Sequence, residues 1–132
     1  MNREQDLTRN QTLVLDRLAA ASVPMSAYDI LDTLREEGIK APLQVYRALD
    51  KLLEKGLAHR LESLNAFVAC AEPHCHRNGI IAFAICETCG SVAEFADDVV
   101  RERLRHWSDA EGFSPNRTTV EIRGTCANCL VA

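Results

Sequence analysis

The chain has 132 residues, enough for one ordinary domain or two small ones, with 47% hydrophobic and 26% charged residues. No apolar run approaches the roughly 20 residues that a membrane-spanning helix requires, so we expect no membrane partner. The formal net charge is −4, and residues 1–70 carry nine Lys or Arg against ten Asp or Glu. Bulk charge therefore gives no support to nucleic-acid binding, and such a role would depend on where individual basic side chains lie.

The first predicted helix begins at a capping motif. Thr8 and Gln11 have the spacing of a capping box, in which each side chain accepts a backbone N–H from the other residue. An apolar stripe follows at helical spacing, formed by Val14, Leu15, Leu18 and Ala19. We expect a helix here with this stripe buried.

The second predicted helix has the same kind of start. Ser26 is placed as its N-cap and Asp29 as its first-turn carboxylate, and Gly38 offers a C-terminal stop. Its apolar residues recur at i, i+3, i+4 and i+7, namely Ala27, Ile30, Leu31 and Leu34. Tyr28 falls off that stripe, so we expect it to point outward.

The third predicted helix runs from Pro42, a residue suited to the first helical position, to a stop at Gly56. Its buried side is expected to carry Val45, Leu49, Leu52 and Leu53. Its other side shows Gln44, Tyr46, Arg47 and Lys51.

Two strand-like runs follow, residues 57–62 and 66–70, so we predict a β-hairpin. Three helices and a hairpin form the winged-helix variant of the helix-turn-helix. In that arrangement the third helix lies in the major groove, with its N-terminal residues at base edges, and the hairpin flanks the phosphates. Tyr46 and Arg47 are well placed for such contacts, although a solvated or packed surface position is the commoner fate of a lone Tyr or Arg.

The chain changes character after Cys70, because residues 71–79 are polar and turn-rich. We interpret them as a hinge between an N-terminal domain, residues 1–70, and a C-terminal domain, residues 80–132. The expected fold class is α+β, with a winged-helix DNA-binding domain followed by a small α/β domain.

The C-terminal domain is predicted to contain three strands, over residues 80–85, 92–95 and 118–123. The last strand alternates, and we expect Val120 and Ile122 to point inward with Glu121 outward.

Asp97 and Asp98 are predicted to cap a helix in the same domain. That helix carries Val100, Leu104 and Trp107 on one face. About 55 residues are too few for a robust independent core, so we expect this domain to need both a metal staple and a second copy of itself, as a homodimer.

Two Cys-x-x-Cys pairs, Cys86 with Cys89 and Cys126 with Cys129, each sit beside a strand-like run. A two-residue gap lets both sulfurs of one turn point at the same ion, and two such turns complete a closed tetrahedral Zn²⁺ shell. Two disulfides or a redox-active pair are the alternatives. Zinc is favoured because no secretory leader precedes the chain, and the cytoplasm, where we expect this protein, keeps thiols reduced.

Helix and metal motifs occur together in a fixed order along the chain. They are the string from Tyr46 to Asp50, then Gly56-Leu57 and the strand with His59, then Cys86-x-x-Cys89-Gly90 and finally Cys126-x-x-Cys129. In this order they resemble the ferric uptake regulator family of metal-dependent bacterial repressors, from about residue 7 to the end. Within that family the chain most resembles the zinc uptake regulators. Gln11 stands where the family usually has an Arg, and the segment before it is shorter than usual.

The resemblance also implies a second, sensing metal site. Iron and peroxide sensors of the family place a His-rich sequence before the first Cys pair, but residues 79–85 offer no ligand here. Zinc regulators fill the site with a His, a Cys, a second His and a Glu in chain order, which implies His59, Cys70, His76 and Glu94. His74 is the next choice for the hinge ligand, and Cys75 is a third. A thiolate ligand favours zinc over the harder Fe²⁺ or Mn²⁺.

Taken singly, these residues have plainer interpretations. Cys70 would be a small buried side chain, His59 a hydrogen-bonded strand residue and Glu94 a solvated edge residue.

By resemblance, Tyr28, Tyr46 and Arg47 match DNA-contacting positions of the zinc regulators. The implied function is a homodimer that holds two Zn²⁺ per chain, one structural and one regulatory, binds double-stranded operator DNA when the regulatory ion is present, and represses zinc uptake genes. The alternatives are a protein-interaction or metal-carrier module on the same scaffold, or a family member that responds to another metal. We expect neither an enzyme nor a small organic substrate, because both sites have four protein ligands, whereas a catalytic zinc needs an open position.

Overall fold

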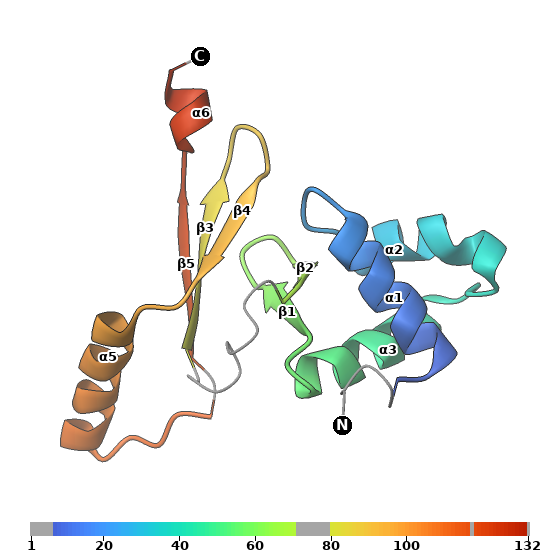
Figure 1. The fold of residues 1–132 in the computed structure, drawn as a ribbon. Coiled ribbons are helices and arrows are strands. Elements are labelled where there is room, and N and C mark those ends of the chain that lie inside the picture. Colours follow the sequence, from blue (N-terminus) through green and yellow to red (C-terminus); the bar gives the residue numbers. More distant parts are fainter. Residues whose placement is uncertain (1–6, 71–79, 117, 132) are drawn as a thin grey trace. The chain divides into compact units, whose positions relative to one another are not determined.

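The computed structural model describes residues 7–70, 80–116 and 118–131 of the chain (Figure 1). It divides into two compact units, Met1–Cys70 and Ala71–Ala132. In the described part of the chain each unit has a sheet of its own, with two strands in the first and three in the second. Among the described residues, no helix is both long and apolar enough to cross a membrane.

The first unit consists of helices followed by a hairpin, as the sequence predicts. Its elements in chain order are α1 (Arg9–Ala20), α2 (Ala27–Leu34), the 3₁₀ turn η2 (Arg35–Glu37), α3 (Pro42–Glu54), β1 (Ala58–Leu61) and β2 (Ala66–Ala69). This is the winged-helix order, with α3 immediately before the two-stranded wing (Figure 1).

The predicted capping box of the first helix is present, and the predicted N-cap of the second helix also forms a capping box. At α1, the Gln11 N–H donates to Thr8 Oγ1 (3.2 Å) and the Thr8 N–H donates to Gln11 Oε1 (3.1 Å). At α2, the same exchange joins Asp29 and Ser26, at 3.1 and 3.2 Å. Each box satisfies two backbone donors that the start of a helix leaves unpaired, and so it determines the residue at which the helix begins.

The core of this unit lies between the three helices and the wing. Its larger side chains that are at most 1% exposed include Val14, Ile30, Ile39, Val45, Leu49 and Leu52. Leu15 and Leu53, also predicted to be buried, are half-buried at its edge. Ala19 is exposed, contrary to the prediction, because the helix turns it about 100° away from Leu18, which faces the core.

The wing is an antiparallel hairpin whose register pairs Ala58 with Ala69 and Leu61 with Ala66. Asn65 closes its turn with φ 49°, a left-handed conformation that Asn tolerates better than most residues. Met25, in the loop between α1 and α2, exchanges two backbone hydrogen bonds with Phe67, at 3.1 and 2.8 Å. The hairpin is thereby attached to the helical part of the same unit.

The second unit is built on a mixed sheet in the order β4-β3-β5. The central strand β3 (Ile80–Cys86) pairs antiparallel with β4 (Val92–Phe95) and parallel with β5 (Thr118–Gly124). Two helices complete it, α5 (Asp98–Glu111) between β4 and β5, and α6 (Ala127–Leu130) after β5. The three predicted strands and the predicted helix are therefore confirmed.

Helix α5 begins as predicted, because Asp97 Oδ1 accepts the N–H groups of Val99 and Val100, at 2.9 and 3.1 Å. Figure 1 shows it beside the end of the sheet rather than across its face. Its apolar residues stay accessible as a result, with exposed fractions of 39% for Val100, 37% for Leu104 and 58% for Trp107.

The predicted orientation of β5 is wrong at two positions. Ile122, predicted to point inward, is 54% exposed, whereas Glu121, predicted to point outward, is half-buried. The register places Glu121 opposite Phe83, whose side chain is buried, and Ile122 opposite Ala84. The more exposed face of β5 at these positions is therefore the one that carries Ile122. The apolar or polar character of the two residues alone does not predict which of them is buried.

Candidate metal centre and nucleic-acid interface

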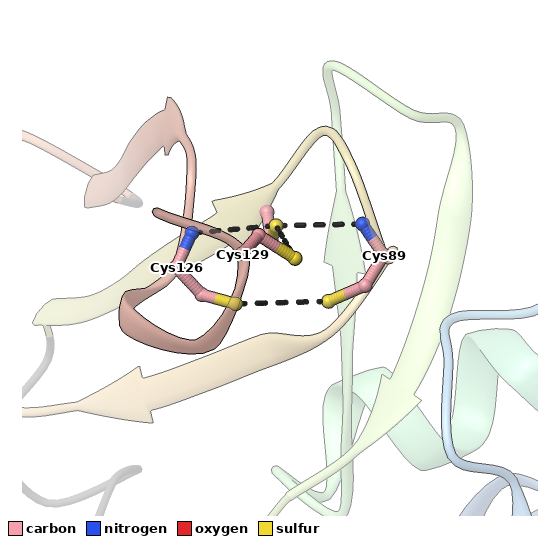
Figure 2. Close-up of side chains that lie close together, drawn as sticks. Cys89, Cys126 and Cys129 are labelled. Atoms are coloured by element: carbon pink, nitrogen blue, oxygen red, sulfur yellow. Dashed lines mark hydrogen bonds between the residues drawn. The ribbon is translucent and has the colours of Figure 1, made fainter. Parts of the chain in front are cut away.

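The four cysteines of the two Cys-x-x-Cys pairs meet at one end of the sheet of the second unit. Cys86 is the last residue of β3, and Cys126 is the N-cap of α6, just after β5. Because β3 and β5 are parallel neighbours with Cys86 opposite Gly124, both strands end at the same edge. The turns that follow them bring Cys89 and Cys129 to the same place (Figure 2).

The four sulfurs have the spacing of a tetrahedral metal shell. The Sγ atoms of Cys86 and Cys129 are 3.8 Å apart, as are those of Cys89 and Cys126, and all four lie within 4.8 Å of one another. A tetrahedron with metal–sulfur bonds of about 2.3 Å has edges of about 3.8 Å. A disulfide would need about 2.05 Å, and all four cysteines are free thiols. The donor set fits Zn²⁺, and the geometry excludes disulfides among these four.

Backbone N–H groups favour the thiolate form of Cys86. The N–H groups of Cys126 and Cys89 donate to Cys86 Sγ, at 3.3 and 3.4 Å, and lower the pKa of Cys86 to about 5. Ser91 Oγ lies 3.1 Å from Cys89 Sγ, and its hydroxyl lowers the pKa of that thiol.

Cys129 behaves in the opposite way. The neighbouring sulfur of Cys126 is the main cause that raises the pKa of Cys129 to about 12. Four negative sulfurs at this spacing repel one another, so they cannot all ionise without a compensating charge. A divalent cation supplies that charge, which is why metal binding to such clusters releases protons.

Of the predicted sensing residues, His59 and Cys70 belong to the first unit. His59 lies on β1 opposite Val68, and Cys70 follows β2, with its N–H donating to Leu57 O at 2.8 Å. A ring nitrogen of His59 and the sulfur of Cys70 lie within 4.8 Å. Burial lowers the pKa of His59 to about 4, so its imidazole is neutral at physiological pH, which is the form that binds metals.

The rest of that set belongs to the second unit or lies outside the described residues. Glu94 lies on β4 of the second unit, opposite Phe83. His74, Cys75 and His76, the three predicted choices for the hinge ligand, lie outside the described residues.

The predicted DNA-contacting residues lie on the surface of the first unit. Tyr28, in the first turn of α2, is 61% exposed, which confirms that it points outward, and Tyr46 on α3 is 41% exposed. Arg47 is exposed, and within the described part of the chain no ion pair engages its guanidinium. Gln44, predicted on this side, instead turns back, and its Oε1 accepts the N–H groups of Lys40 and Ala41.

The wing adds a basic residue that the sequence pattern did not single out. Arg60 Nη2 donates to Asn65 Oδ1 at 2.8 Å, and its Nε lies 3.7 Å from a Glu62 carboxylate oxygen. These contacts hold the guanidinium at the exposed turn of the hairpin. The signal in the sequence is an arginine three residues before a predicted turn, which is too common to select it.

A family model described as "Ferric uptake regulator family" matches residues 5–123. The chain belongs to the ferric uptake regulator family. It is 37% identical to the zinc uptake regulation protein of Escherichia coli K12 over 131 residues, which covers 97% of this chain and 75% of that protein. The family and the resemblance to its zinc regulators, both predicted from the motifs, are confirmed.

Solved structures of this family agree. The holo form of XcZur superposes with a TM-score of 0.87 at 43% identity, covering 96% of this chain and 87% of that one. A zinc uptake regulator complexed with zinc and DNA gives a TM-score of 0.86 at 36% identity, covering 98% and 86%. The ferric uptake regulator of Vibrio cholerae is 21% identical with a TM-score of 0.57, covering 92% of each chain, and shares the fold.

Proposed function

We propose that this chain is a zinc-responsive transcriptional repressor that binds operator DNA as a homodimer and controls zinc uptake genes in the cytoplasm. The observation that carries the proposal is its likeness, at a TM-score of 0.86 over 98% of its length, to a zinc uptake regulator complexed with zinc and DNA. The four-thiol cluster and the exposed α3 supply the two chemical features that such a function requires.

The first proposed ion is structural. Cys86, Cys89, Cys126 and Cys129 would hold one Zn²⁺ as a closed shell of four thiolates. The support is the sulfur spacing of 3.8 Å together with the N–H donors at Cys86. A closed shell leaves no position for a substrate or an activated water, so we propose no enzymatic reaction here.

The second proposed ion is regulatory, with His59, Cys70, His76 and Glu94 as its ligands, giving two ions per chain. Its support is the match of ligand types and chain order to the zinc regulators, together with the neutral imidazole of His59 beside Cys70. His59 belongs to the unit that would read DNA and Glu94 to the unit that would dimerise. Ligands drawn from both units make domain orientation depend on zinc.

That dependence gives a route from zinc to DNA affinity. The two recognition helices of a dimer enter successive major grooves only if their separation is about 34–36 Å. Without a metal that links the two units, the recognition helices sample many separations. Binding to DNA then restricts them to one separation, and this loss of conformational entropy lowers the affinity. Linkage of this kind is typically about 1–3 kcal/mol, or roughly 5- to 150-fold in affinity.

The homodimer is supported by surfaces of the second unit. Val100, Leu104 and Trp107 of α5 are exposed. The ring of Trp107 packs at a tilt against that of Phe113, with the ring centroids 6.0 Å apart, and Phe113 is itself 59% exposed. Among the described strands, β5 has a partner on one edge only. A second copy would cover this apolar surface, which a solvated monomer rarely leaves open.

Counting zinc tests the proposal as a whole. Zinc per chain is measured by mass spectrometry in the reduced protein before and after mild chelation, and both samples are titrated into duplexes selected from a random pool. We expect two ions falling to one, with loss of sequence-specific binding. Equal binding before and after removal of the labile ion would overturn the regulatory role.

A further inference from the structure

Leu43 is an apolar side chain at a position where a recognition helix reads DNA. It is the second residue of α3 and is 56% exposed. Tyr46 and Arg47 follow it by three and four residues, so the helix places them one turn further along, on either side of Leu43. The three side chains therefore form one surface, opposite the buried Val45 and Leu49.

The polar side chain of the same turn is partly engaged by the backbone. Ala41, the N-cap residue, has no side-chain acceptor, and Gln44 supplies the cap instead. Gln44 Oε1 accepts the N–H groups of Lys40 at 2.9 Å and of Ala41 at 3.1 Å, which keeps this polar side chain against the backbone. In the first turn of α3 the more exposed side chain is therefore the aliphatic Leu43, while Gln44 is half-buried with its oxygen engaged.

The major groove has one apolar group that matches it. Among the four bases, only thymine carries a methyl group, at C5, on its major-groove edge, and apolar side chains recognise it. The N-terminal residues of a recognition helix are those that reach base edges. One helical turn is about 5.4 Å and one base step about 3.4 Å, so Leu43 and Arg47 would reach base pairs within about two steps of each other.

We propose that Leu43 is a specificity-determining residue that contacts the C5-methyl group of a thymine in each operator half-site, close to the base pair that Arg47 contacts. The proposal rests on the proposed function, because it requires α3 to enter the major groove. It adds a base preference that no hydrogen bond of this turn could provide.

The test removes one methyl group at a time. Duplexes are first selected from a random pool with the zinc-loaded chain, and each thymine of the selected half-site is then replaced by deoxyuridine, which lacks only the C5-methyl. Loss of one buried methyl should weaken wild-type binding by about 4-fold per half-site, or about 15-fold when both half-sites are changed. Fluorescence anisotropy measures the affinity.

The variant Leu43→Ala completes a double-mutant cycle. We expect it to bind thymine and deoxyuridine duplexes equally at that position, while zinc content and thermal stability stay at wild-type values because the side chain is exposed. The matched control is Leu64→Ala, which truncates another exposed leucine, 43% accessible, in the turn of the wing. It should keep the full deoxyuridine effect.

Two results would overturn the proposal. One is a wild-type protein that is indifferent to every deoxyuridine substitution, and the other is a methyl effect of unchanged size in Leu43→Ala. Both leave zinc-dependent selection of DNA intact, so they are distinct from failure of the proposed function, in which no duplex would be enriched.

Discussion

The N-terminal unit buries its apolar side chains within itself, whereas the C-terminal unit leaves many of its own exposed. Val14, Ile30 and Leu52 are fully buried between helices and wing. In the second unit, the described side chains that are buried come mainly from β3, and Trp107, Phe113 and Ile122 are all more than half exposed. One half of the chain is thus held by hydrophobic burial, whereas under the proposed function the other half, which buries less apolar surface, would depend on a metal shell and a second copy.

The largest expected effect comes from breaking the four-thiol shell. In Cys86→Ser, the second unit should lose its ordered structure and its dimer, because structural zinc in small domains contributes an apparent binding free energy of about 10–16 kcal/mol. The first unit should remain folded, since its core contains no metal ligand. Amide hydrogen exchange followed residue by residue, with sedimentation for the dimer, measures both. A dimer with protected β3 amides in this variant would show that the second unit does not depend on zinc.

Truncating one leucine in each unit sharpens the same comparison. Leu49→Ala, at a 1% exposed position of the first unit, should lower the free energy of unfolding of that unit by about 2–5 kcal/mol. Leu104→Ala, at a 37% exposed position, should change the stability of the isolated unit little and should raise the dimer dissociation constant instead. Urea unfolding over a range of protein concentrations separates the two effects. Equal, concentration-independent losses would argue against a dimer interface on α5.

A change at His59 tests whether the two units communicate. His59→Ala should remove one zinc per chain and reduce operator affinity about 5- to 150-fold, to the level of the chelated wild type, because only the proposed regulatory ion is lost. His106→Ala, at an exposed position on α5, is the matched control and should keep both ions. Zinc analysis and anisotropy are done in reducing buffer, since Cys70 must be a thiol. If His59→Ala retains two ions, His59 is not a ligand.

A substitution of Arg47 tests base recognition by the first unit, the unit whose apolar core is buried. Arg47→Ala should weaken operator binding by about 1–3 kcal/mol and relax the preference at one base pair, because an arginine can donate two hydrogen bonds to a guanine edge. Its exposed position predicts unchanged stability. Binding to operator and to unrelated duplexes is compared at one salt concentration. A uniform loss on both would make this a phosphate contact.

The smallest expected effect comes from a helix cap. Ser26→Ala removes the acceptor of the Asp29 N–H and should cost about 1 kcal/mol of stability in the first unit. The second unit and zinc content should be unaffected, because the cap is local. Thermal unfolding with zinc analysis checks this. A loss of zinc would indicate that a residue outside the proposed ligand set affects metal binding.

The sequence by itself determined what depends on near neighbours in the chain. The caps at Thr8 and Ser26, the buried stripe of α2 and the turn residues around the wing require only residues a few positions apart, because helices and hairpins are built from such contacts. The Cys-x-x-Cys spacing likewise predicted the cluster of four thiols. The order of the helix and cysteine motifs along the chain predicted the ferric uptake regulator family.

Only the tertiary structure decided which sides of these elements are covered. It placed the second Cys pair beside the first through the parallel pairing of β3 and β5, across about 40 residues of chain, and it turned Gln44 back onto the backbone. It also exposed Ile122 and half-buried Glu121, against the predicted alternation. The physical reason is that a strand pattern gives two faces but not their surroundings, which depend on contacts between residues far apart in sequence.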